Sequence, residues 1–243
     1  MQTASRYLEY LQSKIQEVMD TELPNIERAA RLIADSCMKG GRLYTFGTGH
    51  SHLIAEELYI RAGGLALVHA ILPQELMLNQ MATKSTMLER LEGIGPALID
   101  LYHVDEKDTL LVISNSGRNA VPVEMCLAAK EKGACVIAMT SMKHTSGCTS
   151  RHSSGKKICD IADVVLDNHA EKGDAGLHVE GLGTPIGPVS DATGIAIAQA
   201  MISEAIDIMV REGFEPPVFT SSNVDGGDEK NADLYKKYFG YWK

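Results

Sequence analysis

The first forty residues have the apolar spacing of two helices. Apolar residues recur every three or four positions from Leu8 to Val18, which predicts a first helix with one apolar face. A second helix is expected to begin near Pro24, because proline suits a first helical turn, and to stop at Gly40. We expect residues 1–40 to form a helical extension that packs on the core or on a partner subunit.

Five short apolar runs follow, separated by helical stretches. They cover residues 43–46, 65–69, 109–113, 135–139 and 164–166, and each is predicted to be a strand. Residues 110–113 are apolar on both faces, which is typical of a parallel sheet covered by helices on both sides. The predicted fold class is therefore α/β, with a doubly wound five-stranded parallel sheet in a flavodoxin-like three-layer sandwich.

The stretches between the runs carry helix boundaries. Residues 51–61 are followed by two glycines, and residues 121–132 begin with a proline and stop at a glycine. Residues 192–210 are apolar nearly all round, so this helix is expected to be deeply buried or, as we favour, to pack against a second subunit. We predict one domain over residues 41–213 and a C-terminal tail over residues 214–243 that becomes ordered on contact.

Composition restricts the class of protein. The chain has 243 residues, of which 44% are hydrophobic, and this is enough for one large core. A formal charge of -9 and a pI near 5.4 oppose binding to nucleic acid. The five cysteines are odd in number and form no C-x-x-C pair, which favours a reducing cytoplasm. The N-terminus has no apolar leader and no later stretch is expected to be long enough to span a bilayer, so we predict a soluble protein without a membrane partner.

Two polar loops with glycines follow the first and third predicted strands. They are Gly47-Thr48-Gly49-His50-Ser51 and Ser114-Asn115-Ser116-Gly117-Arg118-Asn119. Ligands of an open parallel sheet bind beyond the carboxyl ends of its strands, and each loop offers hydroxyl groups, a turn glycine and the start of a helix to a phosphate. Ser, Asn and Gly are also ordinary helix caps, but two such loops on one sheet edge favour an anion site.

A dinucleotide site is the main competing interpretation, because Gly47 and Gly49 begin a G-x-G-x-x-G pattern. The third glycine position is His52, and the next predicted strand, which ends near His69, is not followed by the acidic residue that binds a ribose. We therefore expect a phosphate site without a dinucleotide, and no cofactor.

The S-x-S-G pattern of the second loop resembles the phosphosugar loop of the sugar isomerase (SIS) domain family. The first loop is similar to that family's first loop, and residues 187–190 before the long apolar helix are similar to its last segment. The resemblance covers about residues 40–210 and is closest to small, single-domain SIS proteins that are often labelled phosphoheptose isomerases without an assigned reaction. It implies a five-stranded parallel sheet and a dimer with sites near the subunit interface. We expect a homodimer or a homotetramer. Asn119 stands where many members carry Thr or Ser, which replaces a hydroxyl contact to phosphate by an amide contact.

The resemblance also implies roles for individual residues. The residues expected to bind the phosphorylated sugar are Thr48, Gly49, His50, Ser51, Ser114, Asn115, Ser116, Gly117, Asn119 and Ser190. Glu180 follows the fifth predicted strand, and amino-sugar isomerases that this chain resembles have their catalytic base in a similar position. Glu180 is therefore the first candidate base, and His178 beside it is the second candidate. Glu75 follows the second predicted strand and is a third catalytic candidate, although Pro followed by Glu is equally a common helix start.

A metal site is a further alternative. His144, Cys148 and His152 stand four residues apart, and imidazole and thiolate are zinc ligands. The serines and glycines between them form a poor helix, so we predict no metal there. This polar segment and residues 173–183 are instead expected to form a lid over the ligand.

The leading hypothesis is a sugar-phosphate isomerase that acts on an aldose phosphate or an amino-sugar phosphate. The phosphoheptose isomerase activity is less favoured, because His52, Glu56 and Glu57 do not reproduce the spacing of those enzymes. Two alternatives use the same phosphate loops: a SIS-type lyase that cleaves a lactyl ether from muramic acid phosphate, and a non-catalytic sugar-phosphate sensor. The expected partners are a phosphorylated sugar or amino sugar and further copies of this chain.

Overall fold

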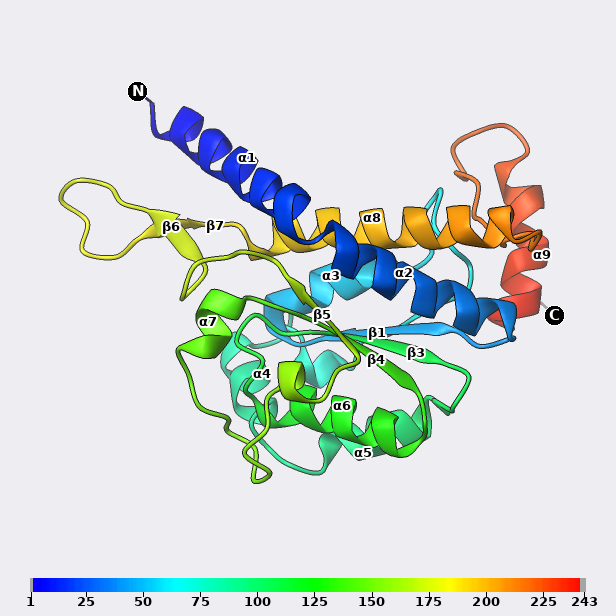
Figure 1. Ribbon diagram of the computed structural model, residues 1–243, viewed down its shortest axis with the longest axis horizontal. Helices are drawn as coiled ribbons and strands as arrows, with labels where there is room; N and C mark the ends of the chain where they lie inside the picture. The colour runs from blue at the N-terminus through cyan, green and yellow to red at the C-terminus, as the bar shows by residue number, and fades with distance from the viewer. Residues whose placement is uncertain (1, 241–243) are drawn as a thin grey trace.

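The fold is a three-layer arrangement around one parallel sheet (Figure 1). A computed structural model describes residues 2–240, so Met1 and residues 241–243, at the ends of the predicted extension and tail, lie outside the described part. In chain order the helices and strands are α1 (Thr3–Thr21), α2 (Leu23–Met38), β1 (Leu43–Gly47), α3 (His52–Glu57), β2 (Val68–Ile71), α4 (Ala82–Leu88), α5 (Ile94–Leu101), β3 (Thr109–Ile113), α6 (Ala120–Glu131), β4 (Cys135–Thr140), α7 (Met142–Ser146), β5 (Val164–Asp167), β6 (Ala175–Leu177), β7 (Ile186–Pro188), α8 (Ser190–Arg211) and α9 (Gly227–Tyr238).

The sheet has five parallel strands in the order β2-β1-β3-β4-β5. The chain runs from β1 outward to β2 and then returns to place β3 on the other side of β1, so the direction of winding reverses between β1 and β3. Both of these strands are buried along their whole length, as expected for strands that helices cover on both faces. The predicted doubly wound parallel sheet is confirmed.

Each face of the sheet carries its own apolar layer. On one face α2, α3 and α8 pack over the sheet, and Ile33, Leu111 and Met201 are fully buried together. On the other face α5 and α6 cover a second cluster that contains Phe46 and Met125. Full burial of a side chain of this size stabilises the fold by about 1.5–3 kcal/mol. The two layers hold the strands rigidly, and the loops at the strand ends are fixed with them.

α8 is the long apolar helix that the sequence pattern identified. Within residues 2–240 it is the one helix whose length and composition would allow it to cross a membrane, so the expectation that no stretch approaches this length is wrong. Half of the apolar stretch is buried inside the chain, and core helices pass the same test. Its contacts with α2 and α3 explain the burial.

The second strand begins later than predicted, because its first residues pair with the C-terminal tail. Leu65 forms an antiparallel bridge with Val218, and Gly63 N donates a hydrogen bond to Phe219 O at 2.8 Å. β2 therefore starts only at Val68. α9, which was not predicted, follows this pairing and lies beside the end of the sheet where the strands begin (Figure 1).

α1 and the β6–β7 hairpin extend together beyond the opposite end of the sheet, where the strands finish (Figure 1). Tyr7 Oη on α1 donates to Pro188 O at 3.0 Å, and Arg6 Nη2 donates to His178 O at 2.8 Å. Residues 173–183, predicted as part of a lid loop, contain the first strand of this hairpin. In the single chain α1 thus supports the hairpin from one side.

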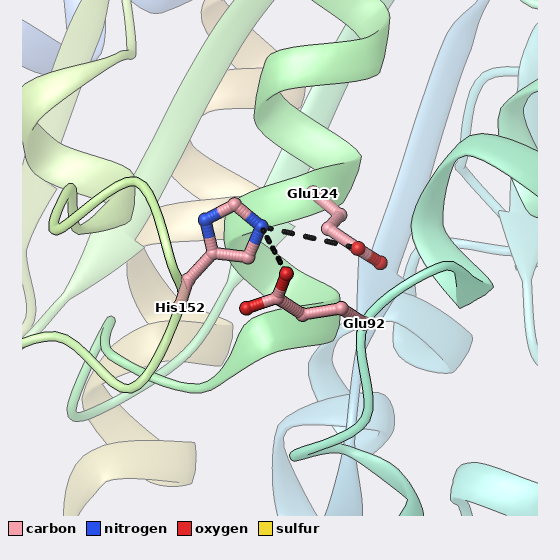
Figure 2. Close-up of side chains that lie close together, drawn as sticks. All are labelled: Glu92, Glu124 and His152. Carbon is pink, nitrogen blue, oxygen red and sulfur yellow. Dashed lines mark ion pairs between the residues drawn. The ribbon is translucent and has the colours of Figure 1, made fainter.

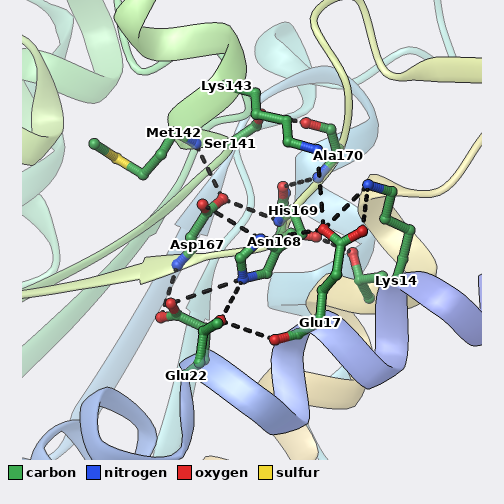
Figure 3. A network of polar contacts seen from close by, with 12 residues as sticks. Lys14, Glu17, Glu22, Ser141, Met142, Lys143, Asp167, Asn168, His169 and Ala170 are labelled. Carbon is green, nitrogen blue, oxygen red and sulfur yellow. Dashed lines mark hydrogen bonds and ion pairs between the residues drawn. The ribbon is translucent and has the colours of Figure 1, made fainter.

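A polar network fastens the N-terminal helices to the loop after β5 (Figure 3). Glu22, at the junction of α1 and α2, accepts a hydrogen bond from Asp167 N at 3.1 Å. Thr21 Oγ1 lies 2.8 Å from His169 Nε2, and the carboxylates of Glu17, Glu22 and Asp167 lie 3.6–3.8 Å from the ring nitrogens of His169. The helical extension is therefore anchored at the carboxyl edge of the sheet.

Candidate functional site

The first loop turns directly from β1 into α3. A Cβ atom at Gly47 would lie 2.4 Å from Ser51 O, so this turn requires glycine. Gly49 has a φ of +59°, in the region that favours glycine. Ser51 N donates to Thr48 O at 3.1 Å and closes the turn. The loop therefore carries the hydroxyls of Thr48 and Ser51 to the carboxyl edge of the sheet.

The second loop folds back on itself between β3 and α6. Gly117 N donates to Ser114 Oγ at 3.2 Å, and a Cβ atom at Gly117 would lie 3.2–3.3 Å from the side chains of Thr140, at the end of β4, and of Thr145 and Ile158 in the segment after it. Thr145 Oγ1 donates to Ser116 O at 2.9 Å from the same segment. Asn119 then forms the N-cap position of α6. The loop is thus held in one shape by its neighbours.

The two loops meet at the carboxylate of Glu89. Thr48 Oγ1 donates to Glu89 Oε2 at 2.7 Å, and Asn119 Nδ2 donates to Glu89 Oε1 at 2.8 Å. The side chains of Thr48 and Asn119 belong to residues that are only 8% and 7% exposed. Donors that converge on one carboxylate have the geometry that an anionic ligand requires. Glu89 directly follows α4, and the sequence pattern did not mark it.

Arg151 lies beside this point, within the field of two further arginines. Arg151 Nη1 donates to Asn119 Oδ1 at 2.9 Å. Burial lowers the pKa of Arg151, the guanidinium groups of Arg118 and Arg90 lower it further, and Glu89 is the carboxylate that opposes them. Arg151 thus places a cation beside the second loop, and a cation there favours a phosphate.

Two hydroxyls in the loops are available to a ligand. Ser51 and Ser116 are half-buried, and neither hydroxyl has a hydrogen-bond partner among residues 2–240. Ser51 precedes α3, and Ser116 lies between Asn115 and Gly117 in the second loop. The site therefore combines occupied donors at Thr48 and Asn119 with free donors on both sides.

Other predicted binding residues have partners inside the chain. Asn115 Oδ1 accepts a hydrogen bond from Asn168 Nδ2 at 3.1 Å. Ser190 Oγ and Ser190 N donate to the Asp174 carboxylate at 2.7 and 2.9 Å, so Asp174 caps the start of α8. His50 is exposed. The roles of Asn115, Ser190 and His50 in ligand binding stay predictions.

Asp191 is a functional candidate that the sequence pattern did not single out. It lies in the first turn of α8 and is half-buried. Burial raises the pKa of its carboxyl group, and the charges that act on it include His50 and His52, which lower it, and Asp174, which raises it. A carboxylate whose pKa is raised beside two imidazoles is suited to proton transfer. An Asp in a first helical turn is so common that the sequence alone gives no signal for this role.

The predicted catalytic residues make no polar side-chain contact with the two loops within residues 2–240. Glu180 and His178 are exposed and lie between β6 and β7, in the hairpin that α1 supports. Glu75 is exposed in a short turn after β2. Within the described chain none of the three side chains has a hydrogen bond or ion pair with a phosphate-loop residue. Their catalytic roles stay predictions.

A possible metal-binding group lies near Arg151 (Figure 2). His152 Nε2 is 3.8 Å from Glu92 Oε2 and 3.9 Å from Glu124 Oε1. Ser154 N donates to His152 Nδ1 at 3.1 Å, so in the neutral ring Nδ1 is the acceptor and Nε2 carries the proton that faces the two carboxylates. A metal at this point needs the Nε2 lone pair, and the geometry therefore favours an ion pair or hydrogen bond over coordination.

The two carboxylates of this group already have structural roles. Glu124 accepts hydrogen bonds from Gly93 N and Gly95 N and caps α5, and Glu92 accepts from Ser153 N at 2.7 Å. The group holds residues 152–153, and with them the neighbouring Arg151, in place.

An open parallel sheet with two hydroxyl-lined loops at its carboxyl edge defines the class of α/β domains that bind small anions. Comparison with known families agrees, since the SIS domain model matches residues 6–141. A UPF0309 protein of Halalkalibacterium halodurans is 52% identical over 232 residues, which are 96% of each chain. The chain therefore belongs to the SIS domain family. The match begins at residue 6, so the N-terminal helices are part of it.

Solved structures share the fold at low sequence identity. The phosphoheptose isomerase GmhA from Neisseria gonorrhoeae superposes with a TM-score of 0.56 at 18% identity, over 84% of this chain and 97% of that chain. The Vibrio vulnificus NanR protein, complexed with ManNAc-6P, gives a TM-score of 0.54 at 11% identity, over 87% of this chain and 65% of that chain. At these identities the similarity concerns the fold.

Proposed function

We propose that the protein binds a phosphorylated sugar or amino sugar between its two loops and isomerises it. The observation that supports this most directly is the convergence of Thr48 and Asn119 on one anionic group, with Arg151 bonded to Asn119. Membership of the SIS domain family supports the same class of ligand.

In this proposal the phosphate lies beside Glu89 and accepts hydrogen bonds from the free hydroxyls of Ser51 and Ser116. The Arg151 guanidinium supplies the charge that offsets the carboxylate. Glu89 keeps Thr48 and Asn119 in fixed rotamers and so holds the two loops together, which fixes the positions of the free Ser51 and Ser116 hydroxyls for the ligand.

Isomerisation requires a base that moves a proton between neighbouring carbons of the opened sugar. Asp191 fits this requirement best within one chain, because its half-buried carboxyl group has a raised pKa and lies in the field of His50 and His52. Glu180 stays a candidate base for a site that the hairpin of a neighbouring subunit completes.

A sugar-phosphate sensor is the second candidate. The fold similarity extends to NanR, whose solved structure contains ManNAc-6P. A sensor would use the same loops, and Asp191 would then have no catalytic role.

A thermal-shift screen against sugar phosphates and amino-sugar phosphates, followed by NMR analysis of the products, tests these proposals. A ligand at a hundred times its Kd adds about 2.7 kcal/mol of apparent stability. Stabilisation with formation of an isomer supports the isomerase, an elimination product indicates a lyase, and stabilisation without turnover indicates a sensor. If no phosphorylated sugar raises the stability of wild type, and the stability of Ser116→Ala in the presence of these sugars is equally unchanged, the proposal of phosphosugar binding is wrong.

A further inference from the structure

The side chain of Arg118 leaves the second loop toward the segment after α7. Its Nη2 atom lies 3.4 Å from Thr149 Oγ1, which is a long contact for a hydrogen bond. Its Nε atom is buried and has no hydrogen-bond partner. Arg118 forms no ion pair with any residue in the described range. A buried donor without a partner costs about 1–3 kcal/mol, so a ligand that accepts from it would be stabilised here.

Arg118 borders a surface hollow of about 480 Å³. The remaining lining residues are Ser146, Gly147, Cys148 and Thr149. Lys172 reaches the same place, because a Cβ atom at Gly147 would lie 3.5 Å from Lys172 Nζ. The hollow is therefore flanked by a guanidinium and an ammonium group, and residues 2–240 supply no carboxylate that pairs with either.

His144, on α7, lies within the field of these two cations. Its Nδ1 atom is buried and, like Arg118 Nε, has no hydrogen-bond partner. Burial lowers the pKa of His144, and the Lys172 and Arg118 charges lower it further. Asp174 is the carboxylate that opposes them, but its oxygens accept the hydrogen bonds that cap α8. Arg118 and Lys172 thus give the hollow a positive charge that no ion pair within residues 2–240 offsets, and His144 lies in the field of the same two cations.

We propose that this hollow is a second anion subsite, and that the ligand is a sugar phosphate with a second anionic group, either a carboxylate or another phosphate. The inference rests on the proposed function, because Asn119 lies in the phosphate site and Arg118 in the second one. Arg151 contacts both residues, since its backbone N donates to Arg118 O at 2.8 Å and its Nη1 donates to Asn119 Oδ1 at 2.9 Å, so the two sites are neighbours that one sugar-sized molecule would bridge. The second anion pairs with the Arg118 guanidinium and with Lys172.

Isothermal titration with matched ligand pairs tests the subsite. Sorbitol 6-phosphate and 6-phosphogluconate differ by a carboxylate, and fructose 6-phosphate and fructose 1,6-bisphosphate differ by a phosphate. In wild type the second anion is expected to lower the Kd about 10-fold or more in one pair, the size of one charge-assisted hydrogen bond. The pair that responds identifies the anion.

Two variants locate the effect. The Kd ratio is the Kd of the ligand without the second anion divided by the Kd of the ligand that carries it. Arg118→Gln is expected to bring this ratio for the responding pair to within about twofold of one. Arg151→Gln is expected to weaken the binding of both ligands of the pair and to preserve the ratio. NMR gives a readout that does not depend on a variant. The Arg118 Nε–H resonance is expected to shift when the ligand with the second anionic group binds, and not when the matched ligand without that group binds.

The outcomes separate the two proposals. If monophosphates bind and the wild-type ratio is near one in both pairs, or if Arg118→Gln keeps the wild-type ratio, the second subsite is wrong and the proposed function stands. If neither member of either pair binds, the second subsite is overturned, and the proposed function is overturned with it when no sugar phosphate or amino-sugar phosphate of the thermal-shift screen stabilises the protein.

Discussion

Glu89 is the residue on which the two phosphate loops depend for their relative position. Its carboxylate accepts from Thr48 and Asn119, and it also places a negative charge beside the proposed phosphate. These two effects oppose each other, because the carboxylate orients the donors while it repels the ligand. An amide at this position keeps an acceptor and removes the charge.

We therefore predict that Glu89→Gln binds a sugar phosphate about 5- to 10-fold more tightly than wild type, since tenfold corresponds to about 1.4 kcal/mol of removed repulsion. Isothermal titration measures the Kd. Glu131→Gln, at the far end of α6, changes the net charge equally and is expected to leave the Kd unchanged. Weaker binding by Glu89→Gln would mean that its carboxylate orders the loops more than it repels the ligand.

Asp191 and Glu180 are the two candidates for the base that moves the proton, and single substitutions distinguish them. We predict that Asp191→Asn lowers kcat about 10²- to 10⁴-fold, the range for loss of a general base, with little change in KM. Because the folded state raises the pKa of Asp191, the ionised base is formed only above the usual carboxyl range, and kcat should rise with pH there. The same shift means that folding favours the protonated form, so the variant should be at least as stable as wild type at neutral pH.

Glu180→Gln is the matched comparison for the other candidate. Full activity in Glu180→Gln together with the loss in Asp191→Asn would remove Glu180 from the mechanism. The reverse result would show that the hairpin supplies the base.

At the scale of helices and strands, the sequence predicted those elements whose stability comes from their own pattern. β1, β3, β4 and β5 lie where the apolar runs predicted them, because runs that are apolar on both faces have no other stable environment than a covered sheet. β2 was predicted too early, since Leu65 pairs with the tail, a contact set by residues about 150 positions away.

The elements that the sequence did not predict depend on tertiary support. The hairpin of β6 and β7 is short and glycine-rich and rests on α1, so its residues resembled a flexible loop. α9 follows turn-forming residues and has few apolar positions. Tyr235 on α9 packs on Phe219 of the tail, and Phe239, just after α9, stacks on His69 of β2. Such contacts leave no local periodicity in the sequence.

The contact between the tail and β2 gives a pH-dependent term in stability. His69 on β2 stacks on Phe239 with ring centroids 4.8 Å apart, and burial lowers the pKa of His69 to about 4. The folded state therefore holds the ring neutral while the unfolded state protonates it near pH 6.5. Stability from this group is present above about pH 6.5 and is lost as the pH falls toward 4.

We predict that, over this pH interval, the free energy of unfolding of wild type falls by about 2 kcal/mol more than that of His69→Gln. This value is smaller than the full pKa shift would give, because the ring of His69 is partly exposed to solvent. Urea unfolding at pH 7, 5.5 and 4.5 measures the difference. Parallel pH profiles for the two proteins would contradict the assignment to His69.

At the scale of the whole molecule, the topology explains why half of the site could be predicted and half could not. The phosphate loops are continuous segments after strands, so glycine and hydroxyl positions were visible in the sequence. Glu89, Arg151 and Asp191 come from three other segments that the sheet brings to the same edge. Their proximity depends on packing, and a single sequence contains no local sign of it.

The arm formed by α1 and the hairpin also bears on assembly. Leu8 on α1 is 63% exposed, and Leu182 in the hairpin is 50% exposed. Leu101 is 69% exposed on α5, which lies on the face of the sheet opposite to α2 and α8 and away from the arm, so it serves as the control position. We predict that the wild-type chain is at least a dimer through this arm, and that Leu8→Asp with Leu182→Asp shifts it to a monomer. Sedimentation equilibrium measures the mass, and Leu101→Asp is expected to leave the assembly intact. A monomeric wild type, or dissociation by the control alone, would contradict the arm as the interface.

The central claim is that the two loops at the carboxyl edge bind the phosphate of a sugar, and the Kd of Ser116→Ala tests it most directly. Titration of the sugar phosphate that stabilises wild type most should give a Kd about 10- to 100-fold higher for Ser116→Ala, because a hydrogen bond to a charged group contributes about 1.5–3 kcal/mol. Ser203→Ala, whose hydroxyl donates to Gln199 O on α8, should bind like wild type. Equal Kd values for wild type, Ser116→Ala and Ser203→Ala would contradict the account.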